Sequence, residues 1–268
     1  MKRLENKNYR SGVNMSRVIA MAGKGGVGKT TVSALLIRYF TKQENGPLLA
    51  IDADPNSNLG ETLGLEIEKT VGDIREDFMR DPQAVPSGMD KMLYLEMLMN
   101  QVLIEQKAFD LLVMGRQEGQ GCYCMVNNIL NRFADELEKN YKYLLVDNEA
   151  GMEHLSRRTS GRVDMLLMVT DYALRGLRAV GRINEMLDGL KLDVKHKGLI
   201  VNRAPETLGK AFLDEAQAIG VPILCTIPDD VNLLEFDMER KSLFDLPDDS
   251  PAVKAVDQLM EKVLKLAG

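Results

Sequence analysis

Short aliphatic segments alternate along the chain with longer segments in which apolar residues recur every three or four positions. The first pattern is typical of strands buried on both faces, and the second is typical of the helices that cover such strands. The alternation predicts an α/β fold in three layers, with a mostly parallel sheet of about seven strands and helices on both faces. The predicted strands are Arg17–Met21, Leu48–Ile51, Phe109–Met114, Tyr143–Val146, Met165–Thr170, Gly198–Asn202 and Pro222–Ile227.

The helical segments and the strands together predict a single domain over residues 16–268, since α/β sheets commonly run beyond about 200 residues in one domain. One helix is expected to begin near Lys29, and a second covers Val126–Lys139. A third, Pro251–Leu266, has an apolar stripe that favours docking on its own sheet over membrane binding. Residues 1–15 are expected to form a flexible polar extension, with Met15 as an alternative translation start. The first helix should carry four residues on one stripe, Leu35, Leu36, Tyr39 and Phe40.

Composition narrows the class of protein. The 268 residues include 34 Lys+Arg and 40 Asp+Glu, which gives a formal net charge of −6. No apolar run approaches the roughly 20 residues of a membrane span, and residues 1–15 lack the apolar middle of a secretory signal. The negative charge disfavours a nucleic-acid-binding surface. We therefore expect a cytoplasmic protein that binds neither membrane nor nucleic acid.

Glycine, carboxylate, amide and thiol groups gather in the segments that follow the predicted strands. In open parallel sheets, ligands bind beyond the carboxyl ends of the strands, so these segments are the candidate site. They are Gly23–Thr31, Asp52–Asn58, Gly115–Cys124, Asp147–His154, Asn202–Arg203 and Pro228–Asp230.

The first of these segments matches the phosphate-binding pattern G-x-x-x-x-G-K-[ST] between a predicted strand and a predicted helix. Glycines let successive N–H groups turn inward, and the helix N-terminus favours an anion. Lys29 is expected to reach the β- and γ-phosphates, and the Thr30 hydroxyl is expected to coordinate Mg²⁺. The predicted nucleotide contacts are Gly23, Lys24, Gly25, Gly26, Val27, Gly28, Lys29, Thr30 and Thr31.

Asp147 ends an apolar strand in the manner of a Walker B element and is expected to hold Mg²⁺ through water. Gly151 follows, where it can approach the γ-phosphate and move as phosphate leaves. Three residues further on, His154 has two open interpretations, a capping or solvent-facing residue and a metal or catalytic residue.

A second lysine, Lys24, makes the phosphate loop resemble that of the MinD/ParA/nitrogenase-iron-protein class of dimeric ATPases. The resemblance implies a homodimer in which Lys24 crosses to the partner's nucleotide, an electrostatic role like that of an arginine finger. An exposed loop lysine without this role is the alternative. The resemblance also implies that Asp54 positions or deprotonates the attacking water and that Asp52 supports the Mg²⁺ shell, where an acidic turn is the plainer interpretation. The expected catalytic residues are thus Lys24, Lys29 and Asp54.

The base is expected to lie against Asn202 and Arg203. An Asn amide suits the N6/N7 edge of adenine, and the guanine signature N-K-x-D is absent from the sequence, so ATP is favoured over GTP. In the relatives that the chain resembles, the positions of Pro228 and Asp229 close over the adenine.

Two of the three cysteines, Cys122 and Cys124, flank Tyr123. In an extended segment both thiols project to the same side, and two thiolates are half of a four-coordinate metal site. A homodimer would bring four sulfurs together. Core packing and a redox pair are the alternatives, and Cys225, in an apolar strand, is expected to be a core residue.

The family resemblance becomes more specific when the cysteine pair is considered together with further residues, namely Gly115-Arg116, Glu118-Gly119 and Asp147…Glu149-Ala150-Gly151…Glu153-His154. Together they resemble the CooC group, the nickel-binding accessory ATPases of carbon monoxide dehydrogenase, and the related accessory protein of acetyl-CoA synthase. The resemblance implies ATP/ADP, Mg²⁺ and Ni²⁺ (Zn²⁺ at the same thiols is open) and an apo carbon monoxide dehydrogenase or acetyl-CoA synthase as partner. The sequence departs from some relatives in having Gln117, Gln120 and Met125 where prolines stand.

Two other functions remain open at this point. One is a membrane- or DNA-positioning ATPase of the MinD/ParA kind, and the other is an electron-transfer protein with a bridging Fe–S cluster. The adjacent cysteines disfavour the cluster, because the nitrogenase iron protein takes its two cysteines from separate loops.

Overall fold

The computed structural model of the chain describes residues 16–81, 84–116, 137, 139–149, 161–190 and 192–266. The described residues form one eight-stranded sheet in the order β3-β4-β2-β5-β1-β6-β7-β8. Its strands are β1 (Arg17–Ala22), β2 (Leu48–Asp52), β3 (Leu103–Glu105), β4 (Phe109–Val113), β5 (Tyr143–Asp147), β6 (Arg162–Asp171), β7 (Asp193–Ala204) and β8 (Ile223–Pro228).

All seven predicted strands are present, and they pair in parallel. The three-residue β3, which pairs antiparallel with β4, was not predicted, because so short a segment has no readable period. β7 begins five residues before its predicted start. The sequence did not reveal these residues, because the first half of the strand alternates exposed and half-buried positions and is not continuously apolar. The expectation of a mostly parallel sheet is therefore confirmed, with one added edge strand.

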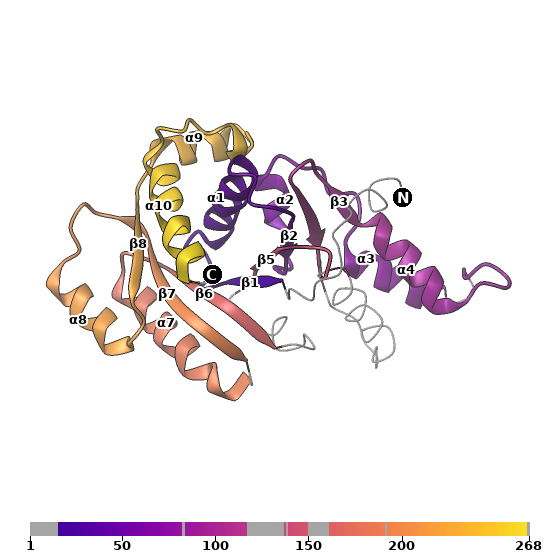
Figure 1. Cartoon of the computed structure of the whole chain (residues 1–268), viewed down its shortest axis with the longest axis horizontal. Helices are drawn as coiled ribbons and strands as arrows, with labels where there is room; N and C mark the ends of the chain where they lie inside the picture. Colours follow the sequence, from indigo (N-terminus) through magenta and orange to yellow (C-terminus); the bar gives the residue numbers. More distant parts are fainter. Residues whose placement is uncertain are drawn as a thin grey trace.

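Helices cover both faces of the sheet, which gives the predicted three layers (Figure 1). One face is covered by α3 (Val71–Arg80), α4 (Lys91–Gln101), α7 (Leu174–Met186) and α8 (Lys210–Ile219). The other is covered by α1 (Lys29–Lys42), α2 (Asn58–Thr62) and α10 (Pro251–Leu266), with α9 (Val231–Met238) at its end. Short 3-10 turns, η1 (Asp188–Leu190) and η2 (Leu243–Asp245), precede β7 and α10.

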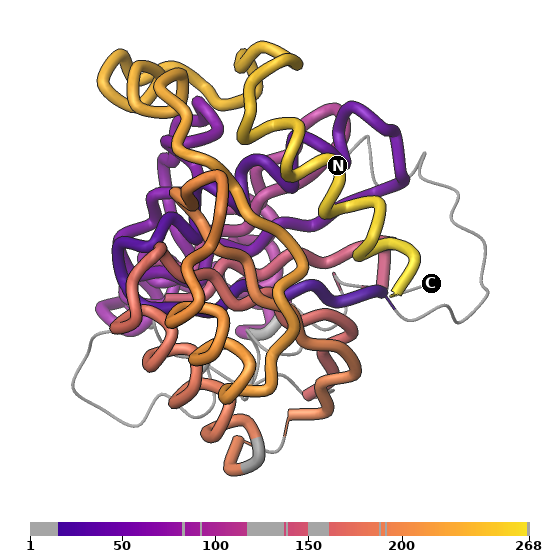
Figure 2. The backbone as a smooth tube through the Cα atoms, turned by 90° about the vertical axis from the view of Figure 1, so that its left-hand side faces the viewer, coloured from indigo at the N-terminus to yellow at the C-terminus, as the bar shows by residue number. Residues whose placement is uncertain are grey.

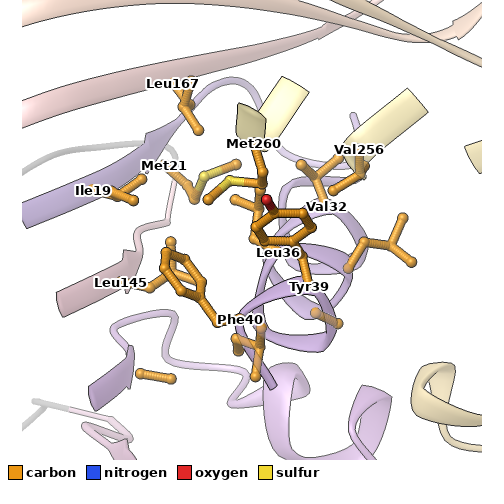
Figure 3. Packing of buried hydrophobic residues seen from close by; sticks show 14 of the residues in the cluster. Ile19, Met21, Val32, Leu36, Tyr39, Phe40, Leu145, Leu167, Val256 and Met260 are labelled. Carbon is orange, nitrogen blue, oxygen red and sulfur yellow. The ribbon is translucent and has the colours of Figure 1, made fainter. Parts of the chain in front are cut away.

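The helix that follows the phosphate loop is buried all round rather than along one stripe. Every residue of α1 from Val32 to Phe40 is buried, because α2, α10 and η2 pack on the side away from the sheet. Figure 3 shows Val32 and Leu36 of α1 beside Met260 of α10, with the sheet residue Met21 on the other side of Met260. The phosphate loop thus leads directly into the most enclosed helix of the described chain.

A buried arginine helps to hold this arrangement. Arg38, in the middle of α1, donates from Nη2 to the carbonyl oxygen of Leu246 (2.7 Å) and to Oδ1 of Asp248 (2.5 Å). Its Nε donates to the carbonyl oxygen of Phe244 at 3.4 Å. A buried guanidinium needs such partners, so the segment between η2 and α10 is tied to α1.

The apolar stripe of α10 is buried against β8 and α1, as predicted for a helix docked on its own sheet. Figure 2 shows α10, in yellow, along one side of the molecule, with α9 at its upper end. None of the helices in the described ranges combines the length and apolar character that a transmembrane span needs.

Shortening a buried side chain on the apolar face of α10 should destabilise the whole domain. Leu259 is fully buried, so Leu259→Ala is expected to lower the free energy of unfolding by about 2–5 kcal/mol through lost burial and a cavity. Leu266→Ala, at a side chain that is 46% exposed on the same helix, should change it by less than about 0.5 kcal/mol. Urea unfolding of both variants measures the difference, and equal effects would contradict the docked orientation of α10.

Candidate functional site

Two glycines of the phosphate loop are required by their neighbours. Gly23 has φ +146°, and a Cβ there would lie 2.3 Å from the carbonyl oxygen of Val169 on β6. Gly28 has φ +91°, and its Cβ would lie 2.3 Å from Nδ2 of Asn202 on β7. Left-handed backbone and the absence of a side chain are both needed at these positions. The loop therefore fits closely between β1 and the carboxyl ends of β6 and β7.

The loop offers an anion site at the start of α1. No described side chain caps the N-terminus of α1, and its first turn has no acidic residue, so its free N–H groups and dipole favour a phosphate. Lys29 is 7% exposed and donates from Nζ to the carbonyl oxygen of Lys24 at 3.3 Å, which holds the ammonium over the loop. The side chain of Lys24 is exposed.

Asp147 brings a carboxylate to the same place. Its strand, β5, lies between β1 and β2, where Asp147 pairs in register with Met21 and with Asp52. Asp147 is fully buried, and neither of its oxygens meets hydrogen-bond geometry with a described residue. Burial raises the pKa of this carboxyl to about 7, although the nearby Thr30 and Ser33 hydroxyls lower it in part.

These groups fit the Mg²⁺ that the fold class implies. A buried carboxylate with unpartnered oxygens is a hard-oxygen donor, and the Thr30 hydroxyl is close enough to affect its pKa. Asp147 and Thr30 would hold the ion, and Mg²⁺ would neutralise charge on the phosphates when bound. Within the described residues, no group of three or more His, Cys, Asp or Glu forms another candidate metal site.

Asp52 organises the turn that follows β2. Its Oδ1 accepts from the N–H of Asp54 (3.1 Å), and its Oδ2 accepts from the N–H of Leu59 (3.0 Å). Burial raises its pKa to about 6, and the two N–H donors oppose this shift. The structure thus places Asp52 beside Asp147, with both of its carboxylate oxygens accepting from backbone N–H groups. Its expected role in the Mg²⁺ shell stays a prediction.

Asp54 lies in that turn and is half-buried. Its Oδ1 accepts from both the backbone N–H and the side-chain amide of Asn56, each at 2.9 Å. Ser57 completes the turn with φ +55°. The expected role of Asp54 toward water stays a prediction.

A cavity of about 570 Å³ adjoins the loop and collects all of the residues expected near the base. Six residues predicted from separate parts of the chain line it, namely Thr30, Thr31, Asn202, Arg203, Pro228 and Asp229. Asn202 is buried and donates from Nδ2 to the carbonyl oxygen of Val27 at 2.9 Å, so it supports the phosphate loop as well as the cavity. Arg203 has φ +51° and lies where the pairing of β7 with β8 is irregular, between Asn202 and Ala204.

Sequence reasoning missed several residues of the site. Glu61 and Thr62 of α2 and Leu233 and Phe236 of α9 also line the cavity, and no local motif marks such helix residues. Asn148 was also missed, although it follows the Walker B-like Asp. It is buried, and its Nδ2 donates to the carbonyl oxygen of Met21 at 2.8 Å, which ties β5 to β1.

Four predicted positions lie outside the described residues, namely Cys122, Cys124, Gly151 and His154. The remaining cysteine corrects an expectation. Cys225 is only half-buried, because β8 is an edge strand, and its Sγ donates to the carbonyl oxygen of Ala255 at 3.4 Å. Burial still raises the pKa of its thiol to about 11, so it is mostly protonated at neutral pH.

A phosphate loop, a buried carboxylate without hydrogen-bond partners among the described residues and an adjoining cavity lie together at the carboxyl ends of the strands, an arrangement suited to a nucleoside triphosphate. The family model described as "CobQ/CobB/MinD/ParA nucleotide binding domain" matches residues 18–243. The chain belongs to this family. It is an ATPase of the MinD/ParA class, and nucleotide binding is the property of its matched domain.

Relatives cover nearly the whole of this ATPase. It is 41% identical to an uncharacterized ATP-binding protein of Methanocaldococcus jannaschii, over 92% of this chain and 98% of the relative. It is 30% identical to the carbon monoxide dehydrogenase accessory protein CooC of Rhodospirillum rubrum, over 93% and 97% of the two chains. The MinD structure with Mg-ADP from Pyrococcus horikoshii superposes with a TM-score of 0.68 at 22% identity, over 95% and 98%, which shows the shared fold.

Replacement of Asp147 should stabilise the free ATPase while removing its activity. The folded-state pKa of about 7 lies above the ordinary 3.8, so the folded chain binds the proton more tightly, and its free energy of unfolding falls as pH rises between about 4 and 7. At pH 8 without Mg²⁺ and nucleotide, Asp147→Asn should be more stable by roughly 1–3 kcal/mol, with a smaller difference at pH 5. Its ATP hydrolysis should fall by more than about a hundredfold.

Urea unfolding at both pH values and a phosphate-release assay measure these effects. Asp164→Asn is the matched control, because hydrogen bonds from Val18, Arg162 and Lys195 hold the pKa of that buried carboxyl below its usual value. This control should destabilise the ATPase at pH 8. If Asp147→Asn were less stable than wild type at pH 8, that result would contradict the inference that the charge of Asp147 is uncompensated in the free folded chain.

Substitution of Gly28 tests the fit of the loop. Gly28→Ala is expected to weaken ATP binding by more than about tenfold, because the new Cβ meets Asn202 and the backbone is left-handed. Gly189→Ala, with no atom within 4 Å of the added Cβ, should leave binding unchanged. Calorimetric titration with ATP measures both, and wild-type affinity in Gly28→Ala would show that the contact with Asn202 is dispensable.

Proposed function

We propose that this ATPase is a CooC-type maturation factor, a metallochaperone that binds nickel as cargo and delivers it to apo carbon monoxide dehydrogenase or acetyl-CoA synthase. The observation that carries the proposal is the pair Cys122 and Cys124 together with the segment Asp147–His154, in a chain 30% identical over 93% of its length to the CooC protein of Rhodospirillum rubrum. Soft thiolate ligands suit Ni²⁺, and Zn²⁺ competes for the same donors.

The proposal includes a homodimer. Two thiols from each copy would complete a four-coordinate site that one copy cannot form alone. The exposed position of Lys24 supports this arrangement, since an ammonium that is not enclosed by its own chain is free to reach a nucleotide on a second copy. In this arrangement Lys24 stabilises the charge that develops on the partner's phosphates, and Asp54 orients the water that attacks them.

ATP hydrolysis would then be coupled to metal release. Backbone hydrogen bonds join the strand ends at the site. The N–H of Ala53 donates to the carbonyl oxygen of Asp147 (2.9 Å), and the N–H of Met114 donates to the carbonyl oxygen of Asp52 (2.8 Å). Met114 leads into Gly115 and Arg116, which precede the cysteine pair in sequence. In this proposal, a displacement of Asp147 or Asp52 as phosphate leaves would reach the start of the cysteine-bearing segment through these hydrogen bonds.

A second candidate is a MinD/ParA-like positioning ATPase. It is favoured by 25% identity to the septum site-determining protein MinD of Bacillus subtilis over 81% of this chain and 78% of that protein. A membrane-binding role for α10 is disfavoured, because its apolar face is buried on β8 and α1. Binding of ATP-loaded protein to anionic liposomes would favour this candidate over the metallochaperone.

The cysteine pair gives the main test of metal binding. The double variant Cys122→Ser/Cys124→Ser should lose the Ni²⁺ that the wild type binds, one ion for each dimer, because two donors from each copy are removed. Cys225→Ser is the matched control and should keep wild-type stoichiometry, since its thiol faces Ala255. Anaerobic titration with Ni²⁺ and Zn²⁺ measures this, and unchanged stoichiometry in the double variant would refute the thiol site.

Removal of the Lys24 charge tests the dimer separately. Lys24→Ala should abolish ATP-dependent dimerisation while ATP affinity changes by less than about threefold, because Lys29 and the loop remain. Lys107 is an exposed lysine just before β4, at the amino ends of the parallel strands and so on the opposite side from the phosphate loop. Lys107→Ala should therefore dimerise normally. Light scattering with and without ATP measures mass, and persistent dimers in Lys24→Ala would refute the cross-interface role.

A further inference from the structure

Asp230 is a buried carboxylate that the nucleotide chemistry does not use. It follows Pro228 and Asp229 at the end of β8, is 5% exposed, and lines the edge of the base cavity with them. A buried carboxylate is retained only where donors compensate its charge, so its partners show what it holds together.

Four donors meet this one carboxylate. Its Oδ1 accepts from the backbone N–H (3.0 Å) and the side-chain amide (2.8 Å) of Asn232. Its Oδ2 accepts from the hydroxyl of Ser250 (2.6 Å) and the backbone N–H of Ala252 (3.1 Å). Burial alone would raise the pKa of Asp230, but these hydrogen bonds outweigh it and leave the pKa below its usual value.

These contacts cap two helices at once. Asp230 is the N-cap of α9 through Asn232, and it reaches the first turn of α10 through Ala252. Ser250 links the two, because its hydroxyl donates to Asp230 and accepts from the N–H of Val253. A carboxylate at a helix N-terminus is stabilised by free N–H groups and the helix dipole.

The two helices differ in how firmly they are held. α10 buries six residues in the core of the domain. None of the eight residues of α9, all of which the structure describes, is fully buried, and Val231, Leu234 and Met238 are more than 60% exposed. Only the half-buried Leu233 and Phe236 of α9 pack against the core, so packing holds α9 less firmly than α10, and the carboxylate tethers it to the firmly packed α10.

The inner side of α9 is a wall of the base cavity. Leu233, Phe236 and Asp237 line the cavity together with Thr30 and Asn202. Any shift of α9 or of the turn at Pro228 and Asp229 changes the space that a base can occupy, while the phosphate loop, mounted on α1, stays in place.

We propose that Asp230 is a positioning residue for the nucleoside: by capping α9 and α10 together, it sets the base-binding wall of the cavity relative to the phosphate loop. It contributes to binding of the base and ribose and leaves the phosphate contacts to the loop. This role does not depend on nickel delivery or on dimerisation, and its failure would leave both of those proposals untouched.

The test compares a ligand that has a base with one that lacks it. In Asp230→Asn, which replaces an acceptor oxygen by an NH₂ that faces donors, ATP affinity should fall about tenfold, the order expected for lost charge-assisted hydrogen bonds. Affinity for inorganic tripolyphosphate should change by less than about twofold. KM for ATP should rise by the same factor as the dissociation constant, with kcat within about twofold of wild type. Calorimetric titrations and steady-state hydrolysis give these values.

Two further variants keep the result interpretable. Asp164→Asn removes another buried, hydrogen-bonded carboxylate, at the start of β6 and far from the cavity-lining residues in the fold. It should lower the melting temperature without changing the ratio of ATP to tripolyphosphate affinity. Ser250→Ala removes one donor from Asp230 and should weaken ATP by about threefold, which provides a milder test if Asp230→Asn does not fold.

Equal losses for ATP and tripolyphosphate in Asp230→Asn would overturn the proposal, because they indicate a general defect of the site. Wild-type ATP affinity in a folded Asp230→Asn chain would also overturn it. If only Ser250→Ala folds, an unchanged ratio of the two affinities refutes the positioning role.

Discussion

Asp147 brings a negative charge into the interior of the sheet, and the structure leaves both of its oxygens without a hydrogen-bond partner among the described residues. Such a charge is costly in a low-dielectric interior, and its raised pKa expresses that cost. The surrounding carboxyl edge is arranged so that a cation can offset this charge and also bind the phosphates. Lys29 lies over the loop, Thr30 is in the first turn of α1, and Asp52 supplies a second carboxylate in register on β2.

The scaffold keeps this arrangement rigid where the chemistry needs it. α1 is enclosed by the sheet, α10, α2 and η2, and the guanidinium of Arg38 ties it to the segment before α10. Gly23 and Gly28 let the loop pack directly on Val169 and Asn202. The phosphate end of the site is therefore preorganised by core packing, which resists small displacements.

The base end is held differently. α9 buries none of its eight described residues fully, and hydrogen bonds at Asp230 connect it to α10. One site thus combines an end enclosed by core packing with an end that packs less extensively, through Leu233 and Phe236, and depends on polar contacts as well. Polar tethers of this kind are weaker than core packing and leave the cavity wall more adjustable.

The amino-acid sequence by itself determined the class of fold, the phosphate loop and the residue types at each strand end. Local patterns suffice for these features, because buried parallel strands are continuously apolar and a phosphate loop needs its glycines and lysine in one short segment. Tertiary structure decided which strand ends meet. The register of β5 against β1 and β2 places Asp147 beside Asp52, and the N–H donors that engage Asp52 and Asp230 come from turns and helices with no motif of their own. Burial, and with it the charge state of these carboxylates, depends on neighbours distant in sequence, so no local pattern can reveal it.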